Sequence, residues 1–347
     1  MKNKKILLIN KSLVIGGIET VLMTQYYSLL EDGHDVDILL FKDMQKQDVE
    51  NLNNIYVLEK KESLKSFVEK REKSRSYDLV VCHAQSEKIC KIVKALNHDK
   101  SIFILHGMHS KKLLSGNIFA RYLRKKRKQL LYKNQNIISV SDAVKEDILS
   151  IGVKPKKIVT IYNPFNIAKI KQLAKEETSF NISKKYIVWV GRISSVKNLP
   201  LAMEIYQKFS NEYDLIIVGD GDKKIIDRLK EMMTDFKLHN KLHFIGAVSN
   251  PYPYIKNASL MLLTSKEEGL PTVALEALIL QTPVFGVDIP AINELLSLFF
   301  PEGLLPNNIE NIKEHIEKNV MREIREKEII STVSFDISNK KYLEYIN

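Results

Sequence analysis

The chain has 347 residues, of which 44% are hydrophobic and 27% charged, and its formal net charge is +11. This length predicts two domains, each large enough to bury its own core, and the composition is that of a soluble globular protein. No apolar run reaches the roughly 18 residues of a membrane-spanning helix, which argues against an integral membrane protein. The two cysteines, Cys82 and Cys90, lack metal-site spacing, so we expect buried thiols in a reduced, cytoplasmic protein.

The positive charge lies in the first half of the chain. Residues 1–165 carry 30 Lys and Arg against 18 Asp and Glu, a net charge of +12, whereas residues 166–347 carry 23 against 24, a net charge of −1. Such an asymmetry concerns partners rather than fold. We therefore expect an anionic partner to meet the first half.

Short apolar runs and helical patterns alternate along the first half. The N-terminus is basic and then apolar but lacks a small-residue cleavage site, so we expect a strand over 6–10 rather than a signal peptide. A helical pattern follows over 18–30. Further strands are predicted at 36–41, 55–58, 79–82, 102–105, 137–140 and 158–161.

The alternation restarts after a polar segment over 166–185, which we interpret as a linker and hinge. Strands are predicted at 186–190, 215–218, 242–245, 260–263 and 284–287, and helices at 198–209, 223–236, 271–280 and 307–327. Continuous apolar strands separated by helices predict parallel sheets that are covered on both faces. The expected fold class is α/β, with two doubly wound, Rossmann-like domains that face each other across a cleft. The expected boundaries are 1–165, 166–334 and a C-terminal helix over 335–347 that packs back toward the first domain.

In such sheets ligands bind at the carboxyl ends of the strands, so the loops there are the candidate sites. Gly16 and Gly17 follow the first strand and let the backbone approach a bound group, although an ordinary turn explains the pair equally well. His106 follows the strand over 102–105. A lone histidine there is usually structural, and with His109 it lacks a third metal ligand of suitable spacing. Ser141 is predicted to cap a helix.

Residues 111–133 carry nine basic residues and no acidic one, and their apolar residues fall on one side of a helix. A solvated helix that packs on the first domain is one interpretation, and nucleic-acid binding is another, although no groove-reading module is apparent. We favour contact with an anionic membrane, worth about 1 kcal/mol per surface cation. The cations assigned to this contact are Lys111, Lys112, Arg121, Arg124, Lys125, Arg127 and Lys128.

Two cations share one loop of the second half. Gly191 and Arg192 follow the strand over 186–190, and Lys197 comes just before a helix. Arg192 can hold an anion such as a diphosphate by a bidentate fork, and Lys197 can hold it as a point charge. Two surface cations are the alternative. Further along, Asp220 and Asp222 flank a glycine, which suggests either a metal site or a turn, and we favour the turn.

The segment 264–277, TSKEEGLPTVALEA, joins an apolar strand to a helix. Pro271 suits the first turn of that helix, so Thr272, Val273 and Ala274 are expected to point unpaired N–H groups at an anion such as a diphosphate. Gly269 lets the backbone approach closely. Glu268 and Glu276 frame the site.

Glu268, Gly269 and Glu276 resemble the E-x7-E signature of the GT-B glycosyltransferases of retaining family 4, the group 1 type found in bacterial polysaccharide and lipopolysaccharide synthesis. The likeness extends from Gly16 to the C-terminal segment, although 288–294 lacks the family's glycine-rich turn. It implies that Glu268 and His106 contact the donor sugar and that Glu276 contacts the ribose. The family's donor site also covers Gly16, Gly17, Arg192, Lys197, Val248, Gly269, Leu270 and Thr272. The catalytic residues expected from it are His106, Glu268, Arg192 and Lys197.

The resemblance implies a hexosyltransferase that moves a sugar, with retention, from a nucleotide-sugar donor to a lipid-linked or polysaccharide acceptor in cell-envelope glycan synthesis. A UDP-sugar is the favoured donor. No metal or other cofactor and no nucleic acid is expected, and the expected location is the inner face of the cytoplasmic membrane. Two alternatives stay open: a GT-B-type epimerase or phosphorylase, and a non-catalytic nucleotide-sugar-binding protein at a membrane surface.

Overall fold

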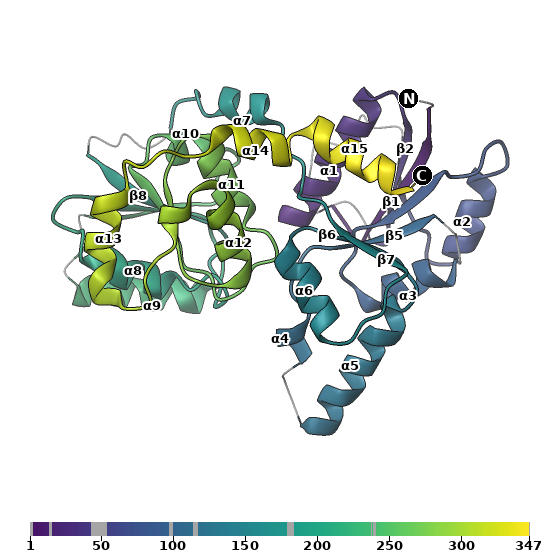
Figure 1. Ribbon diagram of the computed structural model, residues 1–347, viewed down its shortest axis with the longest axis horizontal. Coiled ribbons are helices and arrows are strands. Elements are labelled where there is room, and N and C mark those ends of the chain that lie inside the picture. The colour runs from purple at the N-terminus through teal and green to yellow at the C-terminus, as the bar shows by residue number, and fades with distance from the viewer. Residues whose placement is uncertain are drawn as a thin grey trace. The chain divides into compact units, whose positions relative to one another are not determined.

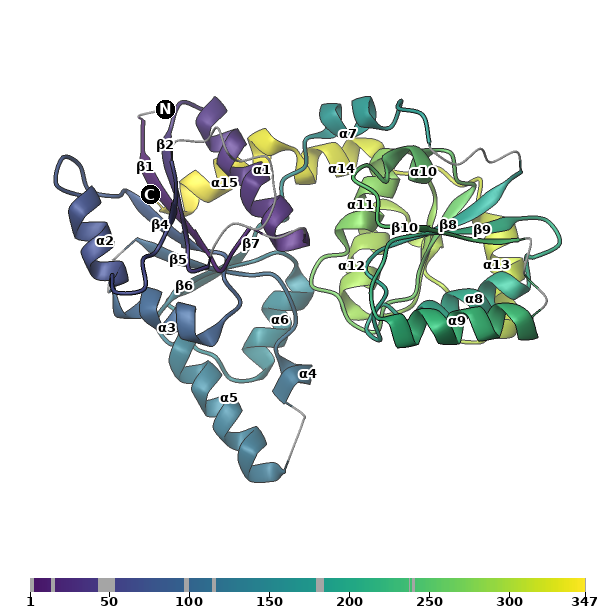
Figure 2. The ribbon, with the colours of Figure 1, turned by 180° about the vertical axis from the view of Figure 1, so that it is seen from behind.

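The computed structural model describes residues 3–13, 16–42, 54–96, 100–113, 117–178, 184–236, 238 and 241–346. The chain forms two compact units, one of residues 1–165 with 333–347 and one of residues 166–332. Each unit is a parallel sheet with helices packed on its faces, so the predicted α/β fold class with two Rossmann-like units is confirmed (Figures 1 and 2).

The sheet of the first unit has the strand order β3-β2-β1-β4-β5-β6-β7. The strands are β1 (Lys5–Asn10), β2 (Asp35–Leu40), β3 (Ile55–Val57), β4 (Leu79–Cys82), β5 (Ser101–Leu105), β6 (Asn136–Ser139) and β7 (Lys157–Thr160). Every residue of β1 is buried, because helices cover both faces of a parallel sheet. Apolar content thus locates these strands better than alternation does.

Most helices of the first unit connect successive strands. They are α1 (Gly17–Glu31), α2 (Leu64–Arg71), α3 (Glu87–Ala95), α4 (Ser110–Leu113), α5 (Ile118–Tyr132) and α6 (Asp142–Ser150). The C-terminal helix α15 (Phe335–Ile346) packs beside α1, where Asn339 Nδ2 donates to Ser28 Oγ and Asp32 Oδ2 at 2.6 and 2.8 Å. The chain therefore returns to its first unit at the end.

The second unit repeats the arrangement with a smaller sheet of order β10-β9-β8-β11-β12. Its strands are β8 (Tyr186–Val190), β9 (Asp214–Val218), β10 (Leu242–Gly246), β11 (Leu260–Leu263) and β12 (Val284–Gly286). Its helices are α7 (Ile167–Leu173), α8 (Leu199–Gln207), α9 (Lys223–Asp235), α10 (Tyr252–Lys256), α11 (Thr272–Ile279), α12 (Pro290–Phe299), α13 (Ile312–Asn319) and α14 (Glu326–Val333). All pairings in both sheets are parallel.

Two expectations for the second unit are wrong. In place of the predicted helix over 307–327 there are a short 3-10 turn, α13 and the start of α14. The helix is interrupted because Arg325 N donates to Phe299 O and the Arg325 guanidinium donates to Leu298 O. These bonds hold residues 320–325 against the end of α12. The predicted linker over 166–185 contains α7, which Asn166 caps and whose Ile170 is buried. The contacts of Arg325 interrupt the helical pattern over 307–327, and the burial of Ile170 favours a helix in the polar segment that begins at residue 166.

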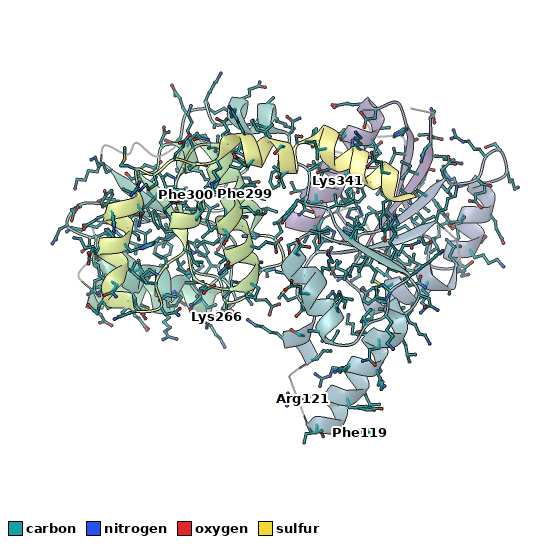
Figure 3. The ribbon with its side chains drawn as sticks, in the orientation of Figure 1. Phe119, Arg121, Lys266, Phe299, Phe300 and Lys341 are labelled. Carbon is teal, nitrogen blue, oxygen red and sulfur yellow. The ribbon has the colours of Figure 1, made fainter. Side chains whose placement is uncertain are left out.

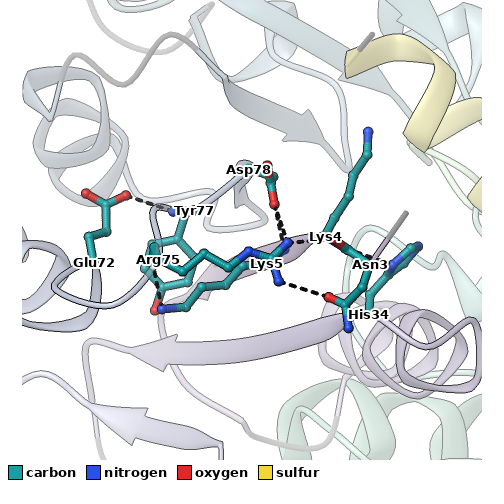
Figure 4. Close-up of polar contacts among 8 residues, drawn as sticks. All are labelled: Asn3, Lys4, Lys5, His34, Glu72, Arg75, Tyr77 and Asp78. Atoms are coloured by element: carbon teal, nitrogen blue, oxygen red, sulfur yellow. Dashed lines mark hydrogen bonds and ion pairs between the residues drawn. The ribbon is translucent and has the colours of Figure 1, made fainter. Parts of the chain in front are cut away.

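The amino ends of the first strands are closed by a polar network (Figure 4). Lys5 Nζ donates to the carbonyls of Arg71 and Arg75 at 2.7 and 3.1 Å, and Lys5 N donates to Asp78 Oδ2 at 2.9 Å. Arg75 in turn pairs with Asp78 at 2.9 Å. These contacts give Lys5, Arg75 and Asp78 partners within the chain at the amino ends of the strands. The loops at the carboxyl ends of the strands are the candidates for ligand binding.

Candidate functional site

The order in which strands are added to the second sheet reverses next to β8. From β8 the chain continues through β9 to β10 on one side, and then crosses to β11 and β12 on the other. The helices that follow β8 and β11 therefore diverge, which leaves space between the two loops at the carboxyl ends of these strands. Arg192 and Lys197 lie in one of these loops, and Glu268 lies in the other.

An ion pair joins these two loops. Lys197 Nζ lies 2.6 Å from Glu268 Oε1, and the two side chains are only 26% and 11% exposed. The backbones are also tied, since Thr264 Oγ1 donates to Lys197 O at 3.2 Å and Lys266 N donates to Val196 O at 2.8 Å. Two residues that the sequence places 71 positions apart thus form one ion pair.

Arg192 is exposed, and it makes no ion pair with any side chain in the described ranges. The neighbouring Gly191 has φ +155, a conformation that favours glycine, and a Cβ there would lie 3.6 Å from the ring of Trp189. The Arg192 guanidinium is thus available to an anion, whereas the Lys197 ammonium already has a carboxylate partner.

The Gly219-Asp220-Gly221-Asp222 turn packs against the loop that carries Gly191 and Arg192. A Cβ on Gly219 would lie 1.9 Å from Gly191 O, and one on Gly221 would lie 2.0 Å from Ile193 O. Asp220 O and Asp222 N bond Ile193 at 2.9 Å each, so the two loops are in backbone contact. The Asp222 carboxylate caps α9. The favoured interpretation, a turn, accounts for both carboxylates, since Asp220 Oδ1 accepts from Gly221 N at 2.7 Å.

The start of α11 differs from expectation. Thr272 N donates to Leu270 O at 2.9 Å and Ala274 N donates to Pro271 O at 3.0 Å, so the prediction of three unpaired donors is wrong for these two. The cause is a tight first turn with short-range hydrogen bonds. The backbone N–H of Thr272 is therefore not available to a diphosphate in this conformation. Leu270 is buried, and Gly269 is also buried and has a partner of its own.

Glu276 lies in the second turn of α11 and contacts a residue that sequence reasoning missed. Tyr252, the first residue of α10, donates its hydroxyl to Glu276 Oε1 at 3.3 Å. Burial raises the pKa of Glu276 to about 7, and the Tyr252 hydrogen bond opposes part of that rise. This carboxyl group therefore changes charge near neutral pH. Val248 follows β10 and is partly exposed at the same edge of the sheet.

In the first unit the strand order reverses between β1 and β4. Gly16 caps α1 in an extended conformation with φ −176, and Glu19 folds back over it, because a Cβ on Gly16 would lie 2.6 Å from Glu19 Oε2. No described atom lies within 4 Å of the position that a Cβ on Gly17 would take. Gly17 thus borders open space at the start of α1.

His106 follows β5 and is paired with a second histidine that the sequence did not single out. His83, directly after β4, places its Nδ1 3.2 Å from His106 Nε2. The loop after His106 is anchored by Asp147 of α6, which accepts from Ser110 N at 3.1 Å and from His109 N. His109 is buried below it. The predicted cap at Ser141 is confirmed, since Ser141 Oγ accepts from Val144 N at 3.2 Å.

The basic segment comprises α4 and α5, and its apolar side is exposed. Ile118, Phe119, Tyr122 and Leu130 are 84%, 69%, 54% and 64% exposed, so this side does not pack on the first unit. Figure 3 shows Phe119 near the N-terminal end of α5, which extends away from the rest of its unit. No helix in the described ranges combines the length and apolar character that a membrane crossing requires.

Not every cation of this segment is at the surface. Lys128 is buried and pairs with Glu87 of α3 at 3.3 Å, so its assignment to a membrane contact is wrong. It faces inward with Leu131 and Tyr132, one turn further on, where α5 packs on α3. Arg121, Lys125 and Arg127 are exposed, Arg124 is half-buried, and Lys111 is exposed on α4. The side chain of Lys112 lies outside the described residues.

Two family models match adjoining parts of the chain. The model described as Glycosyltransferase Family 4 matches residues 15–169, and the one described as Glycosyl transferases group 1 matches residues 170–332. Together they span residues 15–332, which is most of both units.

Curated relatives and solved structures agree with this match. An N-acetylgalactosaminyltransferase that acts on an undecaprenol-linked diacetylbacillosaminyl saccharide in Campylobacter jejuni is 30% identical over 161 residues, which cover 46% of this chain and 43% of that protein. The O-antigen biosynthesis glycosyltransferase WbnH of Escherichia coli is 28% identical over 240 residues, 67% of this chain and 64% of that protein. These matches span less than two thirds of either relative.

Among solved structures, HepE of Anabaena in complex with UDP and glucose superposes with a TM-score of 0.79 at 19% identity, covering 99% of both chains. A glycosyltransferase from Rickettsia africae superposes with a TM-score of 0.77 at 18% identity, covering 100% of this chain and 98% of that one. At these identities the likeness establishes the fold.

Proposed function

The chain belongs to the GT-B glycosyltransferases, and on that premise we propose that it transfers a sugar from a nucleotide-sugar donor, a UDP-sugar in the favoured case, to a hydroxyl of a lipid-linked or polysaccharide acceptor. The names of its relatives support a role in cell-envelope glycan synthesis. The UDP held by HepE supports the choice of nucleotide.

The observation that carries this proposal is the position of Arg192 and Lys197 at the point where the strand order of the second sheet reverses. A departing nucleoside diphosphate gains negative charge as the glycosidic bond breaks, and fixed cations beside it stabilise that charge. Arg192 is exposed and unpaired within the described chain, so it can bind the diphosphate by a bidentate fork. Lys197, held by Glu268, supplies a second positive charge in the same loop.

The remaining roles follow from these positions. Glu268 has one carboxylate oxygen on Lys197 and can offer the other to a hydroxyl of the sugar. Glu276 in its charged form can accept hydrogen bonds from both hydroxyls of the ribose. His106 would contact the sugar from the first unit. The scheme contains no metal ion, and the positive groups that it assigns to the diphosphate are Arg192 and the Lys197 ammonium, which is paired with Glu268.

We infer that the reaction retains the anomeric configuration through an oxocarbenium-like transition state. Lys197 holds one carboxylate oxygen of Glu268, and we assign the other to a sugar hydroxyl rather than to nucleophilic attack. A front-face transfer fits better: the bond between the anomeric carbon and the phosphate oxygen breaks, the hydroxyl oxygen of the acceptor bonds to that carbon on the same face, and the departing phosphate takes the hydroxyl proton. Trapping of a glycosyl-enzyme adduct would contradict it.

The test is turnover of UDP-glucose, UDP-galactose and their N-acetylamino forms by the full chain, with and without EDTA and a polyprenyl-diphosphate-linked saccharide. We expect UDP release that depends on the acceptor and resists EDTA, and proton NMR should show an α-linked product. Epimerised donor without acceptor would indicate an epimerase, and dependence on inorganic phosphate a phosphorylase. Binding without turnover would indicate a non-catalytic protein, and each of these outcomes overturns the proposal.

We further propose that α5 brings the protein to an anionic membrane, at the inner face of the cytoplasmic membrane, where a lipid-linked acceptor would lie. The exposed apolar side chains Ile118, Phe119 and Tyr122 adjoin the exposed cations Arg121 and Lys125. An apolar strip flanked by cations suits insertion among anionic headgroups. Lys128 is buried against Glu87, so it is not part of this surface.

A further inference from the structure

Three polar side chains of the first unit form a hydrogen-bonded row that ends at His106. Gln25 Oε1, on α1, lies 2.8 Å from His83 Nε2, and His83 Nδ1 lies 3.2 Å from His106 Nε2. The row thus connects α1 with the carboxyl ends of β4 and β5. Gln25 and His83 are buried, with 2% and 0% of their surface exposed, whereas His106 is half-buried.

The order of donors and acceptors in this row follows from elementary chemistry. The Oε1 of Gln25 can only accept a hydrogen bond, so the Nε2 of His83 must carry its hydrogen. A neutral imidazole has a single N–H, which leaves the Nδ1 of His83 as an acceptor. The Nε2 of His106 must therefore donate to it, and the Nδ1 of His106 is left with a lone pair. Burial lowers the pKa of His83 well below its ordinary value and that of His106 to about 4, so both rings are neutral at pH 7.

The surroundings hold both rings in place. Their planes are stacked, with centroids 5.3 Å apart and an angle of 25° between them. Gln85 Nε2 donates to His83 O and Ile104 O at 3.1 and 3.0 Å, which ties the loop after β4 to the end of β5. No group in the described part of the chain bonds the Nδ1 of His106, so this lone pair is available to a ligand.

We propose that His83 is a positioning residue that holds His106 as its Nε2–H tautomer, so that the Nδ1 of His106 accepts a hydrogen bond from a hydroxyl of the donor sugar. The part that concerns the sugar rests on the proposed function, whereas the tautomer does not. A histidine with its hydrogen on Nδ1 would instead present a donor to the sugar, and a hydroxyl that donates would lose its acceptor. Gln25 and His83 thus decide what kind of sugar group His106 can bind.

The variants Gln25→Met and Gln25→Glu separate hydrogen bonding from packing. Methionine has nearly the same volume but offers His83 no comparable acceptor, whereas glutamate keeps one. The tautomer of His106 is read from long-range nitrogen–proton NMR of the full chain labelled with ¹⁵N-histidine, and the signals are assigned by their loss in His106→Asn. We expect the Nε2–H tautomer in the wild type and in Gln25→Glu, and a mixture in Gln25→Met. An Nδ1–H tautomer in the wild type would overturn the proposal whether or not the protein transfers sugar.

The second measurement compares the affinities for UDP-glucose and for UDP. Because UDP lacks the sugar, Gln25→Met should weaken UDP-glucose binding about threefold to tenfold, the worth of one hydrogen bond, and leave UDP binding unchanged. Gln25→Glu should restore UDP-glucose binding. Equal losses for both ligands would indicate general disruption, and no loss for either would show that the tautomer does not matter; both results overturn the positioning role. Absence of any nucleotide binding would overturn the proposed function and, with it, the sugar contact of His106, while NMR would still decide the tautomer.

Discussion

Lys197 and Glu268 form an ion pair of 2.6 Å between the loops that follow two neighbouring parallel strands. Because the order in which the strands are added to the sheet reverses between β8 and β11, the pair lies where an α/β sheet leaves space for a ligand. A bound diphosphate would meet the Lys197 ammonium with its carboxylate partner already in place. The pair therefore orients Lys197 before the donor arrives.

Replacement of Lys197 by methionine should lower kcat by about 10²–10³-fold, because one fixed charge beside the leaving group is lost. The measurement is UDP release at saturating donor. Lys208→Met is the matched control, since Lys208 pairs with Glu310 at 2.9 Å in the same unit but outside the candidate site. Equal losses in the two variants would contradict the role of Lys197.

The pH dependence of donor binding should follow Glu276. Its carboxyl group must be charged to accept the ribose hydroxyls, and its pKa is about 7. UDP affinity should therefore rise as the pH increases through 7 and level off above it, and Glu276→Gln should abolish this rise. Tyr252→Phe removes a hydrogen bond that lowers this pKa, so it should shift the midpoint to higher pH. Calorimetric titration with UDP from about pH 5.5 to 8.5 checks both variants. An unshifted midpoint in Tyr252→Phe would show that Tyr252 does not lower the pKa of Glu276.

The same group predicts how stability depends on pH. The folded protein holds the Glu276 proton up to about pH 7, whereas the unfolded chain releases it near the ordinary value of 4.5. The contribution of Glu276 to the free energy of unfolding is thus largest below 4.5, falls as the pH rises to 7 and is constant above that. Urea denaturation of wild type and Glu276→Gln should show the two curves separating over this window. Parallel curves would contradict the raised pKa.

Gly219→Ala should destabilise the second unit by about 2–4 kcal/mol, because its Cβ would overlap a backbone oxygen and its φ suits glycine. The overlap is with Gly191 O, next to Arg192, so UDP affinity should fall as well. Gly107→Ala is the control, since no described atom lies within 4 Å of its Cβ position. Urea denaturation measures both variants. Equal stability would show that the two loops are not in backbone contact.

Membrane contact through α5 predicts a strong dependence on its charge. Arg121→Glu, Lys125→Glu and Arg127→Glu together should weaken binding to phosphatidylglycerol vesicles at least about a hundredfold, at about 1 kcal/mol per cation. These side chains are exposed, so folding should not change. The control reverses Lys223, Lys224 and Lys230, three exposed lysines of α9. Vesicle sedimentation measures both, and equal binding by the two variants would contradict a contact through α5.

Much of the fold could be predicted because parallel strands buried on both faces are continuous apolar runs. The same rule placed Arg192, Lys197 and Glu268 at strand ends. It could not show that Lys197 pairs with Glu268, because that depends on the register in which β8 and β11 align, with Ile187 beside Leu260. Likewise Tyr252 lies 24 residues before Glu276, and no local signal connects them.

Helical periodicity was a poorer guide to what covers a helix. It placed the apolar residues of α5 on one side but could not show that this side is exposed while Lys128 is buried. That result depends on the Glu87 carboxylate of α3, which neutralises the Lys128 ammonium in the packed interface. His83 was missed for a similar reason: a lone histidine after a strand gives no sign of its partner 23 residues later.

Calorimetric titration of the wild type and Lys197→Met with UDP and a panel of UDP-, GDP-, ADP- and CMP-sugars tests the central claim most directly. If Arg192 and Lys197 bind the diphosphate, one class of sugar nucleotide will bind the wild type with measurable heat, and Lys197→Met will bind it more weakly. A folded wild-type protein that binds no member of the panel, or a variant that binds as tightly as the wild type, would contradict the account.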